Sequence, residues 1–273
     1  MRIREHWPIA RSRQRRRDFA AVFGTVPPGA LGDMLEIGSG DGFLASMLAP
    51  LGRSMVTTDL TPGRAAHAPE LPRVRCSATS LPFADASFDF IFSSSVLEHV
   101  RERELAMAEL GRCLRPDGVM IHLMPSTTWK FLQLALYYPH CALSGIEMIG
   151  ANRQLPAAAQ TSTEHWRDEG TKPSLWQEVK RGVFPQVHGE FKGHIREFIG
   201  FRAKSWVGEF ERAGFAVRGV FKLPLCTGYG FGFERLRGLG ERIGLSAHNA
   251  FIVARPGEQP SRDWHWPGEQ AAS

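Results

Sequence analysis

Short apolar runs alternate with segments of helical periodicity between residues 33 and 125. Five of the runs have the length and composition of buried β-strands and are bounded by turn-forming residues. These runs are residues 34–37, 54–58, 74–76, 88–93 and 119–124. The apolar spacing between them predicts helices over residues 42–51 and 102–114. Alternating strands and helices predict a parallel sheet with right-handed crossover connections.

The alternation stops after residue 125 and resumes near residue 203. Residues 126–200 are rich in aromatic residues, glycine, proline and polar residues, without strand–helix alternation. Helices are then predicted over 203–213 and 234–243, and strands over 215–221 and 250–254. Because an interruption of this length in a regular domain usually serves function, residues 126–200 are predicted to form a lid or an acceptor-binding cap.

A single domain over residues 21–255 includes both regular parts and the cap. Residues 1–20 are expected to form a basic N-terminal arm or helix. Residues 256–273 are polar with proline and glycine, and we expect a loose C-terminal tail there. Within the domain, the sequence Arg-Pro-Asp-Gly at residues 115–118 predicts a tight turn before the fifth strand.

The positive charge of the chain is concentrated at one end. The net charge is +5 and the pI about 9.3, which would suggest a nucleic-acid partner. However, residues 1–17 hold seven of the 33 basic residues and only one of the 28 acidic ones, so the remainder is nearly neutral. The arginine-rich arm has three interpretations: the solvated face of a helix that covers a cofactor, a contact to an anionic membrane, or a grip on an anionic acceptor.

The four cysteines indicate the expected compartment. They are scattered, with no C-x-x-C motif and no metal-like pairing with histidine, which predicts a reducing compartment and no metal site. No apolar stretch follows the basic N-terminus, so a secretory signal is not expected. Residues 131–149 are apolar but contain Gln133, Pro139, His140 and Glu147, so they make a poor membrane span. A cytoplasmic location is expected, with peripheral contact to the inner face of a membrane as an option.

A glycine-rich turn follows the first strand directly. Its sequence resembles the dinucleotide fingerprint G-x-G-x-x-G, but Phe43 stands where the third glycine should be. Asp41, within the turn, would repel a pyrophosphate, and Glu36 stands just before the glycines. A ligand with positive charge and no phosphate therefore suits this turn, which points to S-adenosylmethionine with its sulfonium and ammonium groups.

Six segments carry a resemblance to a known family, in the family's order over roughly residues 20–125 and 200–255. They are residues 35–42, 56–60, 81–89, 95–100, 114–118 and 209–215. On these segments the chain resembles a class I S-adenosylmethionine-dependent methyltransferase, of the broad group that includes ubiquinone and menaquinone methyltransferases. The resemblance implies an α/β, Rossmann-like sheet of seven strands. This sheet would be mostly parallel with its last strand antiparallel, with helices on both faces and the cap inserted after strand five. It also implies S-adenosyl-L-methionine as cofactor and S-adenosyl-L-homocysteine as product.

The resemblance also implies which residues bind the cofactor. The turn would pass under the methionine part, and Glu36 resembles the family acid that orders this turn beside the amino group. The turn residues concerned are Gly38, Ser39, Gly40 and Gly42.

Residues after three further strands complete the implied cofactor site. Asp59 would accept both ribose hydroxyls, since a carboxylate can accept two O–H hydrogen bonds. Leu60 would pack on the adenine, and Ser77 and Ala78 would face its edge, although the family usually has Asp where Ser77 stands. Ser94 would lie on the methyl-donor side.

Candidate bases lie at the mouth of the sheet and in the cap. A hydroxyl, amine or acidic carbon acceptor usually needs a base, whereas a carboxylate does not. We predict His99, His188 and Glu190 as catalytic candidates. His122 and His194 are further candidates, and His122 is expected to be a buried or sheet-end strand histidine. A metal at the pair formed by residues 98 and 99, as in some quinone O-methyltransferases, would need further acids, so no metal is predicted.

The acceptor class is open from the sequence. Residues 93–99 lack the Asn/Asp-Pro-Pro-aromatic motif of nucleic-acid amino-methyltransferases, so nucleic acid is not expected. The aromatic residues of the cap suggest a hydrophobic or glycan acceptor, although they could equally form the cap's own core. They are Trp129, Phe131, Tyr137, Tyr138, Trp166 and Trp176.

Transfer to oxygen of a small-molecule, lipid-linked or sugar acceptor is the predicted function. The alternatives are a quinone-type C- or O-methyltransferase, a catalytically silent cofactor-binding subunit that activates a partner, and a module that docks on membrane or nucleic acid through the arginine-rich arm.

Overall fold

The structure is a computed structural model. It describes residues 3–61, 66–150, 185, 187–226, 234–257 and 266, and the side chains of these except at 3–11, 143–150 and 234–236. Trp166 and Trp176 lie outside the described residues.

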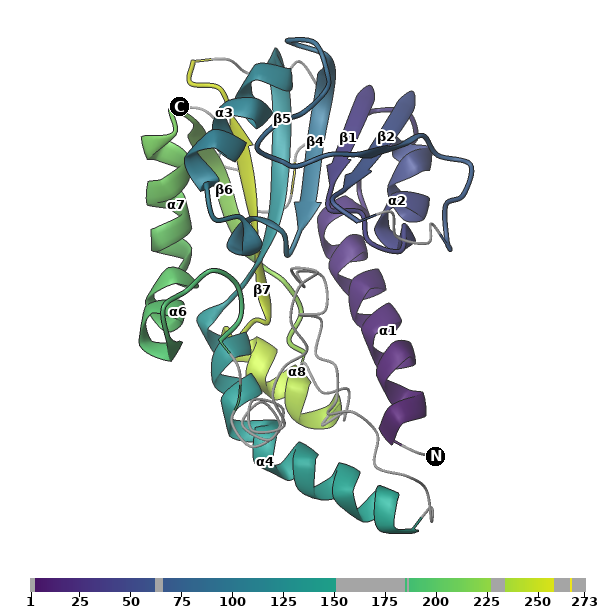
Figure 1. Cartoon of the computed structure of the whole chain (residues 1–273), viewed down its shortest axis with the longest axis vertical. Coiled ribbons are helices and arrows are strands. Elements are labelled where there is room, and N and C mark those ends of the chain that lie inside the picture. Colours follow the sequence, from purple (N-terminus) through teal and green to yellow (C-terminus); the bar gives the residue numbers. More distant parts are fainter. Residues whose placement is uncertain are drawn as a thin grey trace, which may run out of the picture.

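One seven-stranded sheet forms the centre of the fold, in the order β3-β2-β1-β4-β5-β7-β6 (Figure 1). The first five strands pair in parallel, whereas β7 is antiparallel to both β5 and β6. The predicted strands and the antiparallel final strand are therefore confirmed. The strands are β1 (Asp33–Ile37), β2 (Ser54–Asp59), β3 (Arg73–Arg75), β4 (Phe88–Ser94), β5 (Leu114–Pro125), β6 (Ala216–Lys222) and β7 (His248–Ala254).

Helices cover both faces of the sheet. Buried residues of α1 (Ile3–Phe23) and α2 (Phe43–Leu48) pack on one face, and those of α3 (Arg103–Cys113) and α7 (Ala203–Arg212) pack on the other. These two apolar layers leave the strands buried on both sides, as expected for a parallel sheet. Short 3₁₀ helices follow α2 at Ala49–Leu51 (η1) and β4 at Leu97–His99 (η2).

The two ends of the chain differ from the sequence prediction. Helix α1 continues without a break across the predicted boundary at residue 20, and Phe23 packs edge-on against Phe90 and Phe92 of β4. Trp266, in the tail predicted to be loose, is 2% exposed and contacts Phe23 and Phe90. Both differences have the same physical cause. Burying the aromatic rings of Phe23 and Trp266 against the sheet stabilises the fold more than the polar neighbours of these residues favour exposure to solvent.

Two further elements correct the prediction. Residues 115–118 do not turn the chain before the fifth strand but lie within β5, at a shift in its register with β4 between Phe88 and Phe90. Regular structure also continues beyond residue 125, since α4 (Thr127–Gly150) is a helix of 24 residues with Pro139 inside it. Helix α6 (His194–Gly200) ends the predicted cap, and α8 (Glu234–Arg242) follows β6.

The carboxyl ends of β1, β2, β4 and β5 meet at one edge of the sheet, as they must in a parallel arrangement. Helices α1, α4 and α8 extend beyond this edge (Figure 1). Among the described residues no helix, α4 included, combines the length and apolar character needed to cross a bilayer. All four cysteines are free thiols.

Candidate cofactor and acceptor site

The glycine-rich turn joins β1 to α2 in a conformation that favours glycine. Gly38, Gly40 and Gly42 have φ values of +68°, +55° and +78°, the left-handed region that other residues rarely adopt. A Cβ atom on Gly38 would collide with the side chain of Val96, whereas one on Gly40 would meet nothing within 4 Å. Gly38 is therefore required by packing, and Gly40 leaves space in which a ligand can approach the backbone.

Asp59, at the end of β2, is joined to this turn. It is 7% exposed, and its Oδ2 accepts a hydrogen bond from the Gly40 N–H at 2.8 Å. Its Oδ1 accepts from the N–H and the hydroxyl of Thr61, both at 3.1 Å. The predicted ribose-binding residue thus also orders the turn, so a ribose held by Asp59 would lie directly beside Gly40.

Glu36 provides a buried acid beneath the turn. Burial raises its pKa to about 8, against the opposing effect of the positive charges of Arg15 and Arg73. Its Oε2 is buried without a hydrogen-bond partner among the described residues. A buried carboxylate oxygen in this state is stabilised by a cationic donor. The residues present therefore fit a ligand that brings an ammonium group, as S-adenosylmethionine does.

Arginines cover the outer side of the turn. Arg73 of β3 donates to Ser39 Oγ at 2.7 Å and to the Gly40 carbonyl. Arg15 of α1 pairs with Asp41 at 3.0 Å, and Arg16 lies over the ring of Phe43. Of the three interpretations of the arginine-rich arm, these contacts favour a helix that covers the glycine-rich turn. This holds for the arginines whose side chains the structure describes. Sequence reasoning missed Arg73, since nothing in its local pattern marks it as a contact of the turn.

The segment predicted to face the adenine lies beside Asp59. The Cys76 N–H donates to the Asp59 carbonyl at 3.2 Å, which holds the segment against β2. Ser77 and Thr79 share a hydrogen bond between their hydroxyls at 2.7 Å, and Ala78 is buried in the core. Leu60 is partly exposed at the end of β2. The hydrogen bond from Cys76 thus holds the predicted adenine segment beside the end of β2, where Leu60 follows Asp59, and contact with adenine stays a prediction.

The loop after β4 packs on the glycine-rich turn. Val96 lies against Gly38, and Ser95 has a φ of +55° with its N–H bonded to the Leu123 carbonyl at 2.9 Å. Ser94, predicted to face the methyl donor, is partly exposed at this point. The loop carries the chain into η2, so Glu98 and His99 follow within a few residues of the contact between Val96 and the turn.

A second segment, from the far end of the predicted cap, meets η2. The Glu190 N–H donates to the Glu98 carbonyl at 2.9 Å. Gly189, with a φ of +74°, lies so close that a Cβ atom there would be 2.5 Å from the same carbonyl. His188 Nε2 lies 3.6 Å from Glu98 Oε1, and the rings of His188 and His99 are 4.5 Å apart. Two predicted residues, His99 and His188, are thus brought together with Glu98, which sequence reasoning considered only as half of a metal-binding pair.

The other candidate bases lie elsewhere. The Glu190 side chain is exposed, and its Oε2 lies 3.4 Å from Arg101 Nε, outside the buried cluster. His122 is fully buried in the sheet, bonded to Ser93 at 2.8 Å, and burial lowers its pKa to about 3. This agrees with the predicted buried strand histidine. His194 lies 3.6 Å from Glu197.

A buried ion pair lies on the cap side of the cluster. Lys130 of α4 and Glu197 of α6 are both 0% exposed, with Nζ and Oε2 2.7 Å apart. Trp129, next to Lys130, places its ring 4.9 Å from His188. Helices α4 and α6 thus form a wall beside His188, and nothing in the sequence marks Lys130 as buried.

Glu98, His99 and His188 could also hold a metal ion by distance alone. One ligand atom of each lies within 4.8 Å of the others, and two histidines with a carboxylate are a donor set that zinc accepts. The predicted absence of a metal site stays a prediction.

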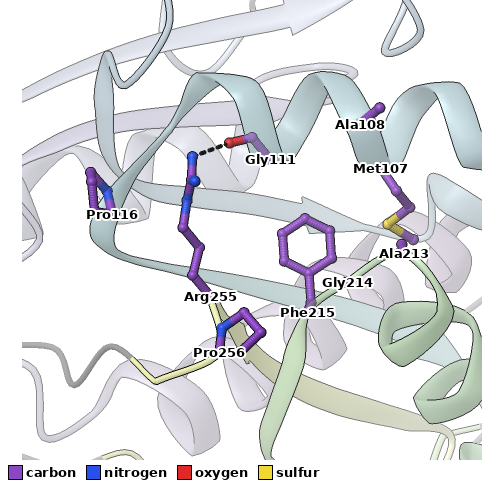
Figure 2. A pocket seen from close by; sticks show the side chains of 9 residues that line it. All are labelled: Met107, Ala108, Gly111, Pro116, Ala213, Gly214, Phe215, Arg255 and Pro256. Atoms are coloured by element: carbon purple, nitrogen blue, oxygen red, sulfur yellow. Dashed lines mark hydrogen bonds between the residues drawn. The ribbon is translucent and has the colours of Figure 1, made fainter.

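A shallow hollow of about 430 Å³ lies at the opposite edge of the sheet, where α3 ends and β7 leaves the sheet (Figure 2). Met107, Phe215 and Arg255 line it, and Arg255 donates to the Gly111 carbonyl at 2.8 Å. None of the predicted site residues lines it, so this hollow is separate from the glycine-rich turn.

Comparisons with known proteins match part of the chain to a family. Residues 35–122 match a family described as a methyltransferase domain. The biotin biosynthesis bifunctional protein BioHC of Cellvibrio japonicus (strain Ueda107) is 39% identical over 90 residues, which are 31% of this chain and 18% of that protein. The chain covers less than half the length of the first curated relatives that it matches.

Solved structures match over most of the chain. A structure described as a S-adenosylmethionine-dependent methyltransferase from Thermotoga maritima has a TM-score of 0.55 at 17% identity and covers 92% of this chain and 94% of its own. A methyltransferase in complex with the Trm112 methyltransferase activator of Haloferax volcanii has a TM-score of 0.53 at 14% identity, with 92% and 98% covered. At these identities the matches show the fold alone.

Proposed function

The chain carries a class I S-adenosylmethionine-dependent methyltransferase domain, and from this premise we propose that it transfers the methyl group to a hydroxyl oxygen of a small-molecule, lipid-linked or sugar acceptor. The single observation behind the choice of oxygen is the buried imidazole of His188, which lies against Glu98 and His99 at the end of the loop that packs on the glycine-rich turn. A hydroxyl must lose a proton during methyl transfer, and a neutral imidazole can accept it.

S-Adenosylmethionine, when bound, supplies the methyl group and leaves as S-adenosylhomocysteine. In the proposed site the glycine-rich turn and Asp59 hold the cofactor, and Glu36 pairs with its ammonium. Burial lowers the pKa of His188 to about 4, so its imidazole is neutral at pH 7, which is the form that a base needs. The wall formed by α4 and α6, including Trp129, would hold the acceptor against His188.

Replacing Asp59 by alanine is expected to weaken binding of S-adenosylhomocysteine at least tenfold, a loss of about 1.4 kcal/mol. The change removes the ribose acceptor and the hydrogen bond that orders Gly40. Isothermal titration calorimetry of the wild type and the variant measures the effect. Asp85→Ala, which changes an exposed carboxylate paired with Arg112 near the start of β4, is the matched control.

Four outcomes distinguish the proposal from its alternatives. Micromolar binding by the wild type that weakens in D59A but not in D85A supports the cofactor site, and labelled S-adenosylmethionine then tests hydroxyl acceptors against their amine analogues. Methylation of the amines alone would refute transfer to oxygen. Binding without any turnover would favour the silent subunit, and a folded wild type that binds nothing would refute the proposed site.

Binding of S-adenosylhomocysteine is also expected to tighten as pH rises from 6 to 8, by up to about tenfold per pH unit. In the free protein Glu36 is protonated below its raised pKa of about 8. The ammonium of the ligand favours the carboxylate, so binding below pH 8 releases a proton, and this cost disappears above pH 8. Calorimetry at several pH values, in buffers of different ionisation enthalpy, measures both the slope and the proton released. Glu36→Gln should flatten this slope, and an unchanged slope in that variant would show that Glu36 does not pair with the ammonium.

A further inference from the structure

We propose that Glu98 is the positioning residue of His188: its buried carboxylate accepts the Nε2–H of the imidazole and leaves Nδ1 to take the proton of the acceptor. The inference rests on the proposed function for the role of His188, but the pairing itself is a property of the protein alone.

Backbone geometry forces the two side chains together. The Glu190 N–H bonds to the Glu98 carbonyl, and the left-handed Gly189 allows the closest approach of the two segments. His188, the residue before this glycine, is therefore fixed over η2. The Nε2–Oε1 distance of 3.6 Å is somewhat longer than a hydrogen bond, and such distances in enzymes often shorten only when the ligands are bound.

The buried carboxylate of Glu98 lacks a hydrogen-bond donor. Its side chain is 0% exposed, and neither carboxylate oxygen has a hydrogen-bond partner among the described residues. Burying a carboxylate without a partner is unfavourable in free energy. Accordingly, burial raises the pKa of Glu98 to about 7. His188 Nε2 lies within reach of this carboxylate, and an imidazole N–H is the type of donor that stabilises it.

The surroundings of the pair carry further titratable groups. His99 faces it from η2, Lys130 from α4 and Glu197 from α6. The positive charges of His99 and of Arg103 in α3 oppose the effect of burial on Glu98. Burial and the charge of His188 lower the pKa of His248 in β7. Lys130 and Glu197 neutralise each other at 2.7 Å. Glu98 is thus the group placed to stabilise an imidazolium at His188 when the acceptor gives up its proton.

The proton balance of the step is simple. As the acceptor oxygen bonds to the methyl carbon and the carbon–sulfur bond breaks, the hydroxyl proton moves to His188 Nδ1. The imidazolium, paired with the Glu98 carboxylate, then releases this proton to solvent. Glu98 keeps its negative charge throughout, as the orienting acid of a hydrolase triad does.

The experiment observes the hydrogen bond directly. An imidazole N–H bonded to a carboxylate exchanges slowly and resonates far downfield, so ¹⁵N-histidine-labelled protein is studied by NMR at pH 8.5, above the raised pKa of Glu98, with and without S-adenosylhomocysteine. We expect one such proton in the wild type, assigned to His188 by its absence in His188→Asn. It should disappear or move upfield in Glu98→Gln and persist in His99→Asn. The melting temperature of each variant, measured alongside, shows that it is folded.

Two results would overturn the proposal. One is the absence of a downfield His188 proton in the wild type under both conditions, or its persistence unchanged in Glu98→Gln. The other is stoichiometric binding of Zn²⁺ that shifts His99 and His188 together and is lost in Glu98→Gln, which would make the cluster a metal site. Neither result depends on methyl transfer, so failure of the proposed function would be recognised separately in the titrations with S-adenosylhomocysteine.

Discussion

Replacing Lys130 by methionine is expected to lower the free energy of unfolding by about 3–5 kcal/mol. Lys130 and Glu197 are both fully buried, and Lys130 also donates to Gln133 at 3.1 Å. Methionine fills a similar volume but leaves the Glu197 carboxylate buried without its cation, 3.6 Å from His194. Urea denaturation followed by circular dichroism measures the change.

A double variant and a surface control make this prediction specific. Lys130→Met combined with Glu197→Leu removes both charges, so it should regain most of the stability lost in the single variant. Arg101→Met breaks the exposed pair with Glu190, and it should change the free energy of unfolding by less than about 1 kcal/mol. If Lys130→Met lowered the free energy of unfolding as little as Arg101→Met does, the buried pair would not hold α4 against α6.

The sheet and the cofactor turn could be predicted because their signals are local. Most strands contain a short apolar run, although β3 has a single valine between two arginines. The left-handed φ values of Gly38, Gly40 and Gly42 need glycine whatever the rest of the chain does. Asp59 was found for a similar reason, since it ends the strand that follows the turn. The resemblance to a family added the expected roles of these positions in binding the cofactor. The positions lie close together in the sequence.

The elements that sequence reasoning missed depend on distant contacts. Helix α4 contains Pro139, and proline usually breaks a helix. Its many aromatic residues were therefore interpreted as part of an irregular cap. Trp266 has polar neighbours, but it is held by Phe23 and Phe90, which are far away in the sequence. Local propensity cannot foresee such packing.

The acceptor side of the site was only half predictable for the same reason. His99 and His188 stand out as histidines near predicted loops, but Glu98 was considered only together with His99 as a metal-binding pair. Its burial follows from the approach of Gly189, and that of Lys130 from the position of α6. Chemistry that arises from two segments meeting in space leaves no pattern in either segment alone.

Replacing Gly38 by alanine is expected to lower the free energy of unfolding by about 2–4 kcal/mol, while Gly40→Ala should cost about 1–2 kcal/mol. Both positions have left-handed φ values, but only at Gly38 does the new Cβ atom meet the side chain of Val96. Gly40 faces open space, so its alanine variant should remain folded and lose cofactor affinity instead, because the methyl group would occupy the space left for the ligand. Denaturation curves and titrations with S-adenosylhomocysteine separate the two effects.

The collision with Val96 can be tested by a double-mutant cycle. Val96→Ala removes the methyl groups that a Cβ atom on Gly38 would strike, so Gly38→Ala should cost less in that background than in the wild type. We expect the two substitutions to be coupled by at least about 1 kcal/mol in the stabilising direction, and Gly40→Ala to show no coupling with Val96→Ala. Additive costs for Gly38 and Val96 would mean that glycine is needed at position 38 for its backbone conformation alone, and that the loop after β4 can move away from the turn without loss of stability.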